Sequence, residues 1–147
     1  MLALPKMLRG FSNMAISELF YERLSDPYVT QDRKDEESCF SESTYTDLNA
    51  NALGVEDVYL GRYQMLQGPS LSDLVKAKNP MLDAEMRQEL GAIRAALAAI
   101  PPPFDHAVLA PVGTDAHTKV QAAIDAFAPV QATIHQVADA LGITINI

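Results

Sequence analysis

The stretch EMRQELGAIRAALAAIPPP, residues 85–103, carries the clearest helical pattern in this chain of 147 residues. Its large apolar residues recur at intervals of four, three, four and three, which places them on one face of an α-helix; they are Met86, Leu90, Ile93, Leu97 and Ile100. The charged residues between them, such as Glu89, are expected on the other faces. Three consecutive prolines then end the helix, because proline has no backbone N–H to donate. The stretch predicts an amphipathic helix with one face in a hydrophobic core.

The same spacing extends outward to earlier segments of the chain. One segment runs from Pro5 to about Ser25, and we expect Asp26-Pro27 to end it, because the residue before a proline is pushed out of the helical region. Another runs from Ser43 to Tyr63. Gly54 and Gly61 each weaken this second helix by up to about 1 kcal/mol relative to alanine. We interpret both glycines as places where another helix packs closely.

A last helical segment begins at Thr114, which can cap it, and reaches Leu141, with a kink expected at Pro129. A short capped helix is predicted over 70–78, and loops over 28–42 and 104–113. The only stretch with a strand-like character is the terminal 143–147. Four long helices joined by short or medium connections predict an all-α fold, an antiparallel up-and-down four-helix bundle in which residues 1–147 form a single domain.

Composition limits the possible partners. The formal net charge is −8 and the pI about 4.7, so nucleic acid is not expected as a partner, because its phosphates would be repelled. Cys39 is the only cysteine, and no internal disulfide can form. The N-terminal MLALPKMLRGF does not have the pattern of a signal peptide. No apolar stretch has the roughly 20 residues of a transmembrane segment.

Acidic residues are concentrated in the segment TQDRKDEESCFSESTYTDLNANALGVEDVYLGRY, residues 30–63. Carboxylate oxygens suit a hard cation such as calcium or iron when several converge. The acids that would do so are Asp35, Glu36, Glu37, Glu42 and Asp47. The alternative is a charged run that faces water. The sequence leaves both interpretations open.

Other side chains in this segment also have two interpretations. Cys39 acts as a nucleophile only beside a base, and no histidine is near it in sequence, so a buried packing role is the alternative. Tyr59, Arg62 and Tyr63 can present hydroxyls and a charge to a ligand in a cleft, or can be core aromatics with a surface arginine. His135 is expected in or near the core. A triad of Ser41, His117 and Asp47 has no supporting spacing.

The residues 30–63 resemble the second conserved block of the imelysin family. The resemblance rests on Glu37-Ser38-Cys39-Phe40-Ser41, on Asp47, and on the pattern Gly54-Val55-x-x-Val58-Tyr59-x-Gly61-x-Tyr63. The flanking sequences MLRGFSNMAISELFYERL (7–24) and QVADALGITINI (136–147) are similar to the corresponding parts of the family. Iron-regulated members usually have histidine at the position of Tyr45.

This resemblance implies the C-terminal half of a protein with two helical bundles, located in the periplasm or on the bacterial surface and linked to iron uptake. A second imelysin-like bundle would be the partner, supplied upstream on the same polypeptide, by a separate chain or by a homodimer. The resemblance also places the block near the cleft between bundles. The ligand-binding or interdomain candidates are therefore Glu36, Glu37, Ser38, Cys39, Ser41, Asp47, Tyr59, Arg62 and Tyr63. Asp35, Glu36 and Glu37 are the candidates for a metal ion, which would be iron, zinc or calcium.

The metal motif of the family, Gly-x-His-x-x-Glu, is absent from this sequence. None of the three histidines has a glutamate three residues later, so peptidase activity does not follow from the resemblance. Three functions remain: a non-catalytic binding domain that serves iron acquisition beside a second bundle, a part of a metallopeptidase whose metal motif lies on another segment or chain, and a self-associating helical module. The sequence predicts no catalytic residue in this chain.

Overall fold

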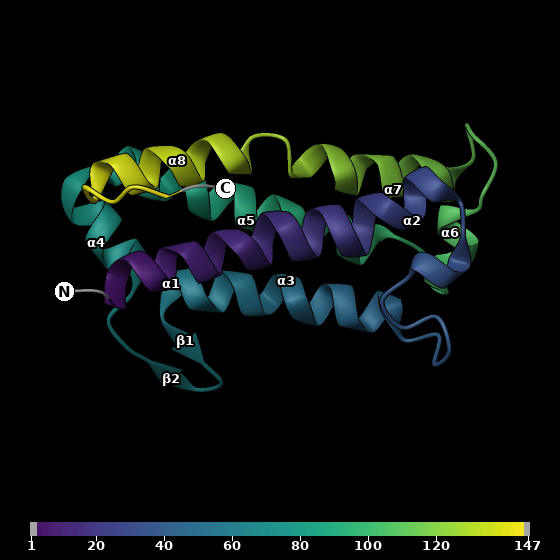
Figure 1. Ribbon diagram of the computed structural model, residues 1–147, viewed down its shortest axis with the longest axis horizontal. Helices are drawn as coiled ribbons and strands as arrows, with labels where there is room; N and C mark the ends of the chain where they lie inside the picture. The colour runs from purple at the N-terminus through teal and green to yellow at the C-terminus, as the bar shows by residue number, and fades with distance from the viewer. Residues whose placement is uncertain (1–2, 146–147) are drawn as a thin grey trace.

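The computed structural model describes residues 3–145, which are almost entirely helical. The first rod is continuous: α1 (Ala3–Ser12), the π-helical η1 (Asn13–Ser25) and α2 (Asp26–Thr30) follow one another without a break (Figure 1). Pro27 therefore does not end the helix, and the prediction that it would is wrong. The backbone N–H of Asp26 donates to the carbonyl of Tyr21, five residues back. This wider turn leaves room for the proline ring, which lies in the first turn of α2, where a missing N–H costs little.

A short 3-10 turn, η2 (Arg33–Asp35), leads to α3 (Thr44–Leu60), which is antiparallel to the first rod. The second helix was predicted to reach Tyr63, but it ends at Gly61, which has a left-handed φ of 65°. A small antiparallel hairpin follows, β1 (Arg62–Tyr63) and β2 (Leu66–Gln67), with Arg62 opposite Gln67. No strand was predicted before residue 143, and the hairpin shows that this is wrong. Each strand has only two residues, which is too short for an alternating pattern to be recognised in the sequence.

The next two helices agree with their sequence signals. In α4 (Leu71–Lys78) the side chain of Ser70 accepts from the backbone of Asp73 and the Asp73 side chain accepts in return, a capping box. Asn79 caps α5 (Pro80–Ala99), and the helix stops before the three prolines as predicted. Glu89 was expected on a polar face of this helix but is buried.

The last part of the chain contains α6 (Phe104–Val108), α7 (Asp115–Ala126) and α8 (Val130–Ala140). The kink expected at Pro129 is instead a break between two helices, with turn-like hydrogen bonds such as that from the Val130 N–H to the Phe127 carbonyl. The short helix α6 occupies the first half of the loop predicted over 104–113, whereas residues 109–113 contain no helix. Residues 143–145 form no strand, and the rest of that predicted segment lies outside the described residues.

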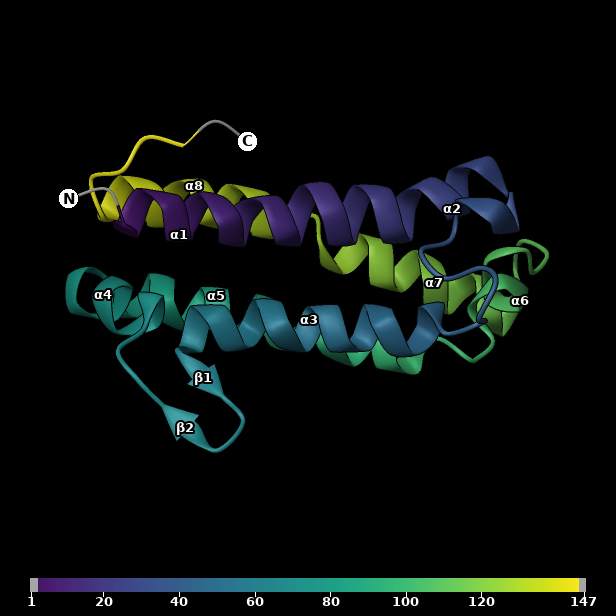
Figure 2. The ribbon, with the colours of Figure 1, turned by 60° about the horizontal axis from the view of Figure 1, so that its bottom comes forward.

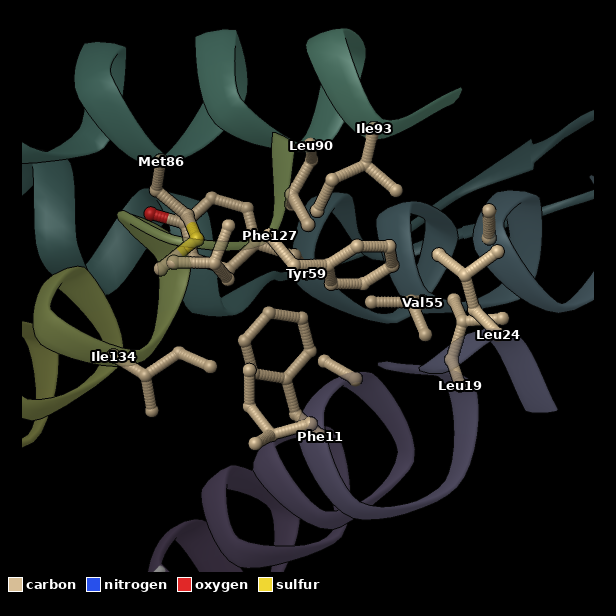
Figure 3. Packing of buried hydrophobic residues seen from close by; sticks show 14 of the residues in the cluster. Phe11, Leu19, Leu24, Val55, Tyr59, Met86, Leu90, Ile93, Phe127 and Ile134 are labelled. Atoms are coloured by element: carbon tan, nitrogen blue, oxygen red, sulfur yellow. The ribbon is translucent and has the colours of Figure 1, made fainter. Parts of the chain in front are cut away.

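The long segments run in alternate directions and enclose one core (Figure 1 and Figure 2). Figure 3 shows this core, in which Phe11, Tyr59, Leu90, Phe127 and Ile134 come from the first rod, α3, α5, the α7–α8 turn and α8. The rings of Phe11 and Tyr59 lie 5.7 Å apart. The apolar face predicted for residues 85–103 is buried as expected, and the all-α class is confirmed. No helix within residues 3–145 has the length and apolar character needed to cross a membrane.

Candidate functional site

Three serines surround one carboxylate at the start of α3, and we call Ser38, Ser41, Ser43 and Asp47 the serine–aspartate cluster. The hydroxyls of Ser38 and Ser43 donate to Asp47 Oδ2 over 2.6 and 2.9 Å. Ser41 Oγ lies 2.9 Å from Ser43 Oγ. The loop from Glu36 to Ser43 thus closes back onto the first turn of the helix. The structure brings together three of the candidates, Ser38, Ser41 and Asp47, which the sequence separates by up to nine residues, and adds Ser43 to them.

The surroundings of Asp47 favour the ionised form of its carboxyl group. Hydrogen bonds from Ser38 and Ser43 lower the pKa of the Asp47 carboxyl below its ordinary range, because hydroxyl donors stabilise the charged form. Asp47 also lies in the first turn of α3, where a negative charge is favoured by the helix dipole. Both serines use the same oxygen, and Oδ1 accepts no hydrogen bond from residues 3–145. One carboxylate oxygen is therefore available to an outside group.

Glu37 ties this loop to two helices. Its carboxylate pairs with Arg23 at 3.0 Å and accepts from Asn51 Nδ2 at 3.1 Å. Arg23 belongs to η1 and Asn51 to α3, so Glu37 bridges the first rod and the helix that follows the loop. This is the geometry of a side chain that positions a loop.

The metal candidates Asp35, Glu36 and Glu37 point in different directions. Asp35 is exposed, whereas Glu36 is buried near Asp105 of α6, and burial raises the pKa of the Glu36 carboxyl. Arg33 pairs with Asp105 at 2.9 Å. Within residues 3–145, no three side chains of histidine, cysteine, aspartate or glutamate are grouped closely enough to hold a metal ion. The donors for a cation would thus have to be completed from outside the chain.

Cys39 is partly exposed rather than buried, and the neighbouring Phe40 is fully exposed. The histidines do not supply a base here. The His117 ring nitrogen hydrogen-bonds to the Tyr28 hydroxyl at 3.0 Å, which ties α7 to α2. His135 is exposed on α8, so its predicted core position is wrong. The buried face of α8 is formed by Ile134 and Val137 and their neighbours, one residue out of phase with the histidine.

Tyr45 occupies the position where the resemblance led us to expect histidine. Its hydroxyl donates to the carbonyl of Ala98 at 3.1 Å. The contact joins the start of α3 to the last turn of α5 and satisfies one of the carbonyls that a helix end leaves open. In this chain the side chain has a packing and capping role.

The remaining candidates, Tyr59, Arg62 and Tyr63, lie at the opposite end of α3 from the serine–aspartate cluster. Tyr59 is fully buried and its hydroxyl donates to Asp83 at 3.0 Å, so it is a core residue and cannot meet a ligand at the surface. Arg62 pairs with Glu56 and Asp57. Tyr63 is exposed on the hairpin. The nine site candidates therefore do not form one site.

Sequence reasoning missed a buried polar network around Asp83. This carboxylate accepts from Tyr59, from Ser72 and from Arg87, which joins α3, α4 and α5. Burial, followed by the charge of Asp83, raises the pKa of the Tyr59 hydroxyl. The spacing of Asp83 and Arg87 by one helical turn was the available signal. A second missed contact is the hydrogen bond from Thr133 to buried Glu89 at 2.9 Å.

An apolar groove of about 460 Å³ runs between α1 and α3, and we call it the α1–α3 groove. Met7 and Val58 on its rim are about half exposed, at 48% and 49%. A second hollow of similar volume lies between α3 and the hairpin and includes Leu53 and Tyr63, which are 40% and 69% exposed. The two hollows share Ala50, Gly54 and Val58. The groove is lined by Lys6, Met7, Gly10, Phe11, Met14, Ala50, Asn51, Gly54, Val55 and Val58.

These features define a protein of the all-α class with a closed serine–aspartate cluster at one end of α3 and an open apolar surface along that helix. The chain belongs to the imelysin family, whose sequence model (Peptidase_M75: Imelysin) matches residues 1–134. Iron-regulated protein A of Synechococcus elongatus is 32% identical over 113 residues, which cover 76% of this chain. The matched part is 32% of that relative, so the chain spans about a third of its length. The resemblance seen in residues 30–63 is confirmed.

Proposed function

We propose that this chain is a non-catalytic binding domain that acts with a second helical bundle in bacterial iron acquisition. The iron link is supported by the similarity to a relative named for its iron regulation, and the need for a second bundle by the length of that relative, which is about three times the matched part. The alternating rods correspond in this proposal to one up-and-down four-helix bundle. The family resemblance supports a periplasmic or cell-surface location.

One observation carries the proposal: the apolar side chains along the outer face of α3 are uncovered, whereas the polar groups at its start are paired within the chain. Burial of apolar surface stabilises association by roughly 25 cal/mol per Å² before the costs of ordering. A monomer that leaves such a surface open gains by covering it. The same side chains hold no reactive group, so the surface is suited to contact rather than to chemistry.

Sedimentation velocity tests the proposal. The purified chain is run alone, and mixed with the part of iron-regulated protein A that lies outside the matched region. We expect association in at least one of the two samples, and the matched region of the relative should compete when it is added in excess. A chain that stays monomeric in both samples at high micromolar concentration would overturn the proposal.

A metallopeptidase part is the second candidate function, favoured by the free Oδ1 of Asp47 on a carboxylate whose pKa is lowered. This oxygen can complete a cation site whose other ligands come from a second bundle. Calorimetry with iron, zinc and calcium separates the candidates. Metal uptake with peptide hydrolysis only in the mixed sample, lost in Asp47→Ala, would support the enzyme. Association without either supports the binding domain.

A further inference from the structure

We propose that the α1–α3 groove is occupied by a second copy of this chain, with the two α3 helices antiparallel and crossing near Gly54. The inference rests on the proposed function and names the bundle that acts as partner. Figure 2 shows α1 and α3 side by side along the molecule, with the hairpin projecting beyond α3. A second helix laid along α3 would thus contact α1 on one side and the hairpin on the other.

The first argument is that α3 is apolar on two faces. Its inward face is buried and includes Leu48, Val55 and Tyr59. Its solvent-facing side exposes Leu53 and Val58, which lie on either side of Ala50 and Gly54 because five residues turn a helix by about 140°. A surface helix of a monomer usually has one apolar stripe opposite a polar face, and a helix that is apolar all round is normally covered all round. The outward stripe therefore indicates a contact that one copy does not supply.

The second argument comes from the glycines that flank the groove. Gly10 and Gly54 lie inside helices, where glycine costs about 1 kcal/mol relative to alanine. A Cβ added at either residue would meet no atom within 4 Å, so packing within the chain does not require them. Gly91 in α5 is equally open, and a helical glycine alone therefore indicates nothing. Gly10 and Gly54 differ because both line the same apolar groove, where a missing side chain lets another backbone approach.

The third argument is charge complementarity about Gly54. Asp47 lies seven residues before Gly54, about 10 Å along α3, and Arg62 lies beyond the other end of the helix, in β1. A two-fold axis at Gly54 brings Arg62 of each copy to the Asp47 end of the other, as a two-fold contact requires. Lys6 lines the groove at the same end as Val58 and has no ion pair within residues 3–145. It would face Glu37 of the other copy.

Light scattering and sedimentation equilibrium of the intact chain test this inference. We expect a species of twice the 16.0 kDa chain mass whose dissociation constant rises at least about tenfold in Gly54→Gln, because the new side chain fills the crossing point. Gly91→Gln is the matched control and should leave dimerisation unchanged. Neither substitution meets an atom within 4 Å at its Cβ, so circular dichroism and thermal melting should show both variants folded.

The charges supply a second measurement. Lys6→Glu should weaken the dimer several-fold at low ionic strength and less at high salt, because screening reduces surface electrostatics. The effect of Lys6→Glu should be smaller in the background of Glu37→Gln, which can still accept the hydrogen bond from Asn51. A monomeric wild type, or a dimer that Gly54→Gln and Lys6→Glu leave unaffected, would overturn the inference. If the chain binds only the remainder of iron-regulated protein A, the second-copy inference fails while the proposed function stands.

Discussion

The two ends of α3 are held by contacts within the chain, whereas the outer face between them is open to solvent. At the start of the helix, Ser38 and Ser43 fill one oxygen of Asp47 and Glu37 bridges two helices. At its end, the chain folds back so tightly that a Cβ on Gly61 would lie 2.8 Å from the Gly68 carbonyl oxygen. Between these ends, Gly54 faces open space.

This difference separates residues that the fold itself requires from residues that face open space and are available for contact. A residue that the chain itself requires should lose stability on substitution in the isolated protein. Substitution of a residue that only a partner requires should leave the stability of the monomer unchanged and weaken its association with the partner. Gly54 inside α3 and Gly61 directly after it give the sharpest comparison, because they are the same residue type and only seven residues apart.

The largest effect is expected for Gly61→Ala. The residue has a φ of 65°, which alanine adopts only with strain, and the new methyl group would meet backbone oxygens at 2.8 and 2.9 Å. We expect a loss of about 2–4 kcal/mol in the free energy of unfolding. Urea denaturation of the wild type and the variant measures it. A loss within experimental error would show that the end of α3 is as open as its middle.

Glu89→Met is expected to have the next largest effect, with the opposite sign. Burial raises the pKa of Glu89, and its Oε2 has no hydrogen-bond partner within residues 3–145. A raised carboxyl pKa means that ionisation destabilises the fold, a cost present above the raised pKa and absent below the ordinary value of 4.5. The variant should gain about 1–2 kcal/mol at neutral pH, because Thr133 still reaches the Pro129 carbonyl.

A pH series of melting temperatures checks this prediction. The advantage of Glu89→Met over the wild type should shrink as the pH falls through the raised pKa of Glu89, and should stop changing below about 4.5, where Glu89 is neutral in both the folded and the unfolded protein. Glu22→Met, at an exposed position of η1, is the control and should change stability little. An advantage that does not depend on pH would mean that better packing, rather than the lost charge, explains the gain.

The double variant Ser38→Ala with Ser43→Ala tests the closed start of α3. The pKa of Asp47 is lowered in the folded protein, so its ionisation stabilises the fold above the ordinary value of 3.8, and this contribution is lost as the pH falls through the lowered pKa. Because Asp47 is only partly buried, we expect a loss of about 1 kcal/mol at neutral pH. NMR titration should show the pKa of Asp47 returning toward 3.8, and an unchanged pKa would contradict the assignment.

The sequence predicted much of this fold because the strongest signals are local. Apolar spacing predicted the helices around Leu90 and Leu48, and the proline run predicted the end of α5. Ser70 and Asp73 predicted the cap at the start of α4. Where a neighbour decides the outcome, local signals failed. Pro27 is tolerated because the preceding turns are wide, and Glu89 is buried because α8 brings Thr133 to it.

The candidate site shows the same limit. Ser38, Ser41 and Asp47 lie together because they are close in sequence and a loop can close on itself. Tyr59, Arg62 and Tyr63 were grouped with them by pattern, but a helix of 17 residues separates the two sets by its length. The exposed apolar residues of α3 were not predicted. The spacing of apolar residues indicates which of them share a helix face, but it does not indicate whether another part of the chain covers that face.

The smallest effect is expected for Gly54→Ala, and its sign is informative. Alanine avoids the conformational cost of glycine inside a helix, and its methyl group would meet no atom within 4 Å, so the variant should gain up to about 1 kcal/mol at concentrations where the chain is monomeric. Gly91→Ala in α5 should gain a similar amount. Thermal unfolding of dilute samples compares the two. At concentrations where the wild type is dimeric, only Gly54→Ala should forfeit part of its gain, because its methyl group holds the crossing helices apart. If both glycines respond alike at every concentration, Gly54 has no role in contact, and the contrast between the outer face of α3 and its ends reduces to an ordinary exposed helix.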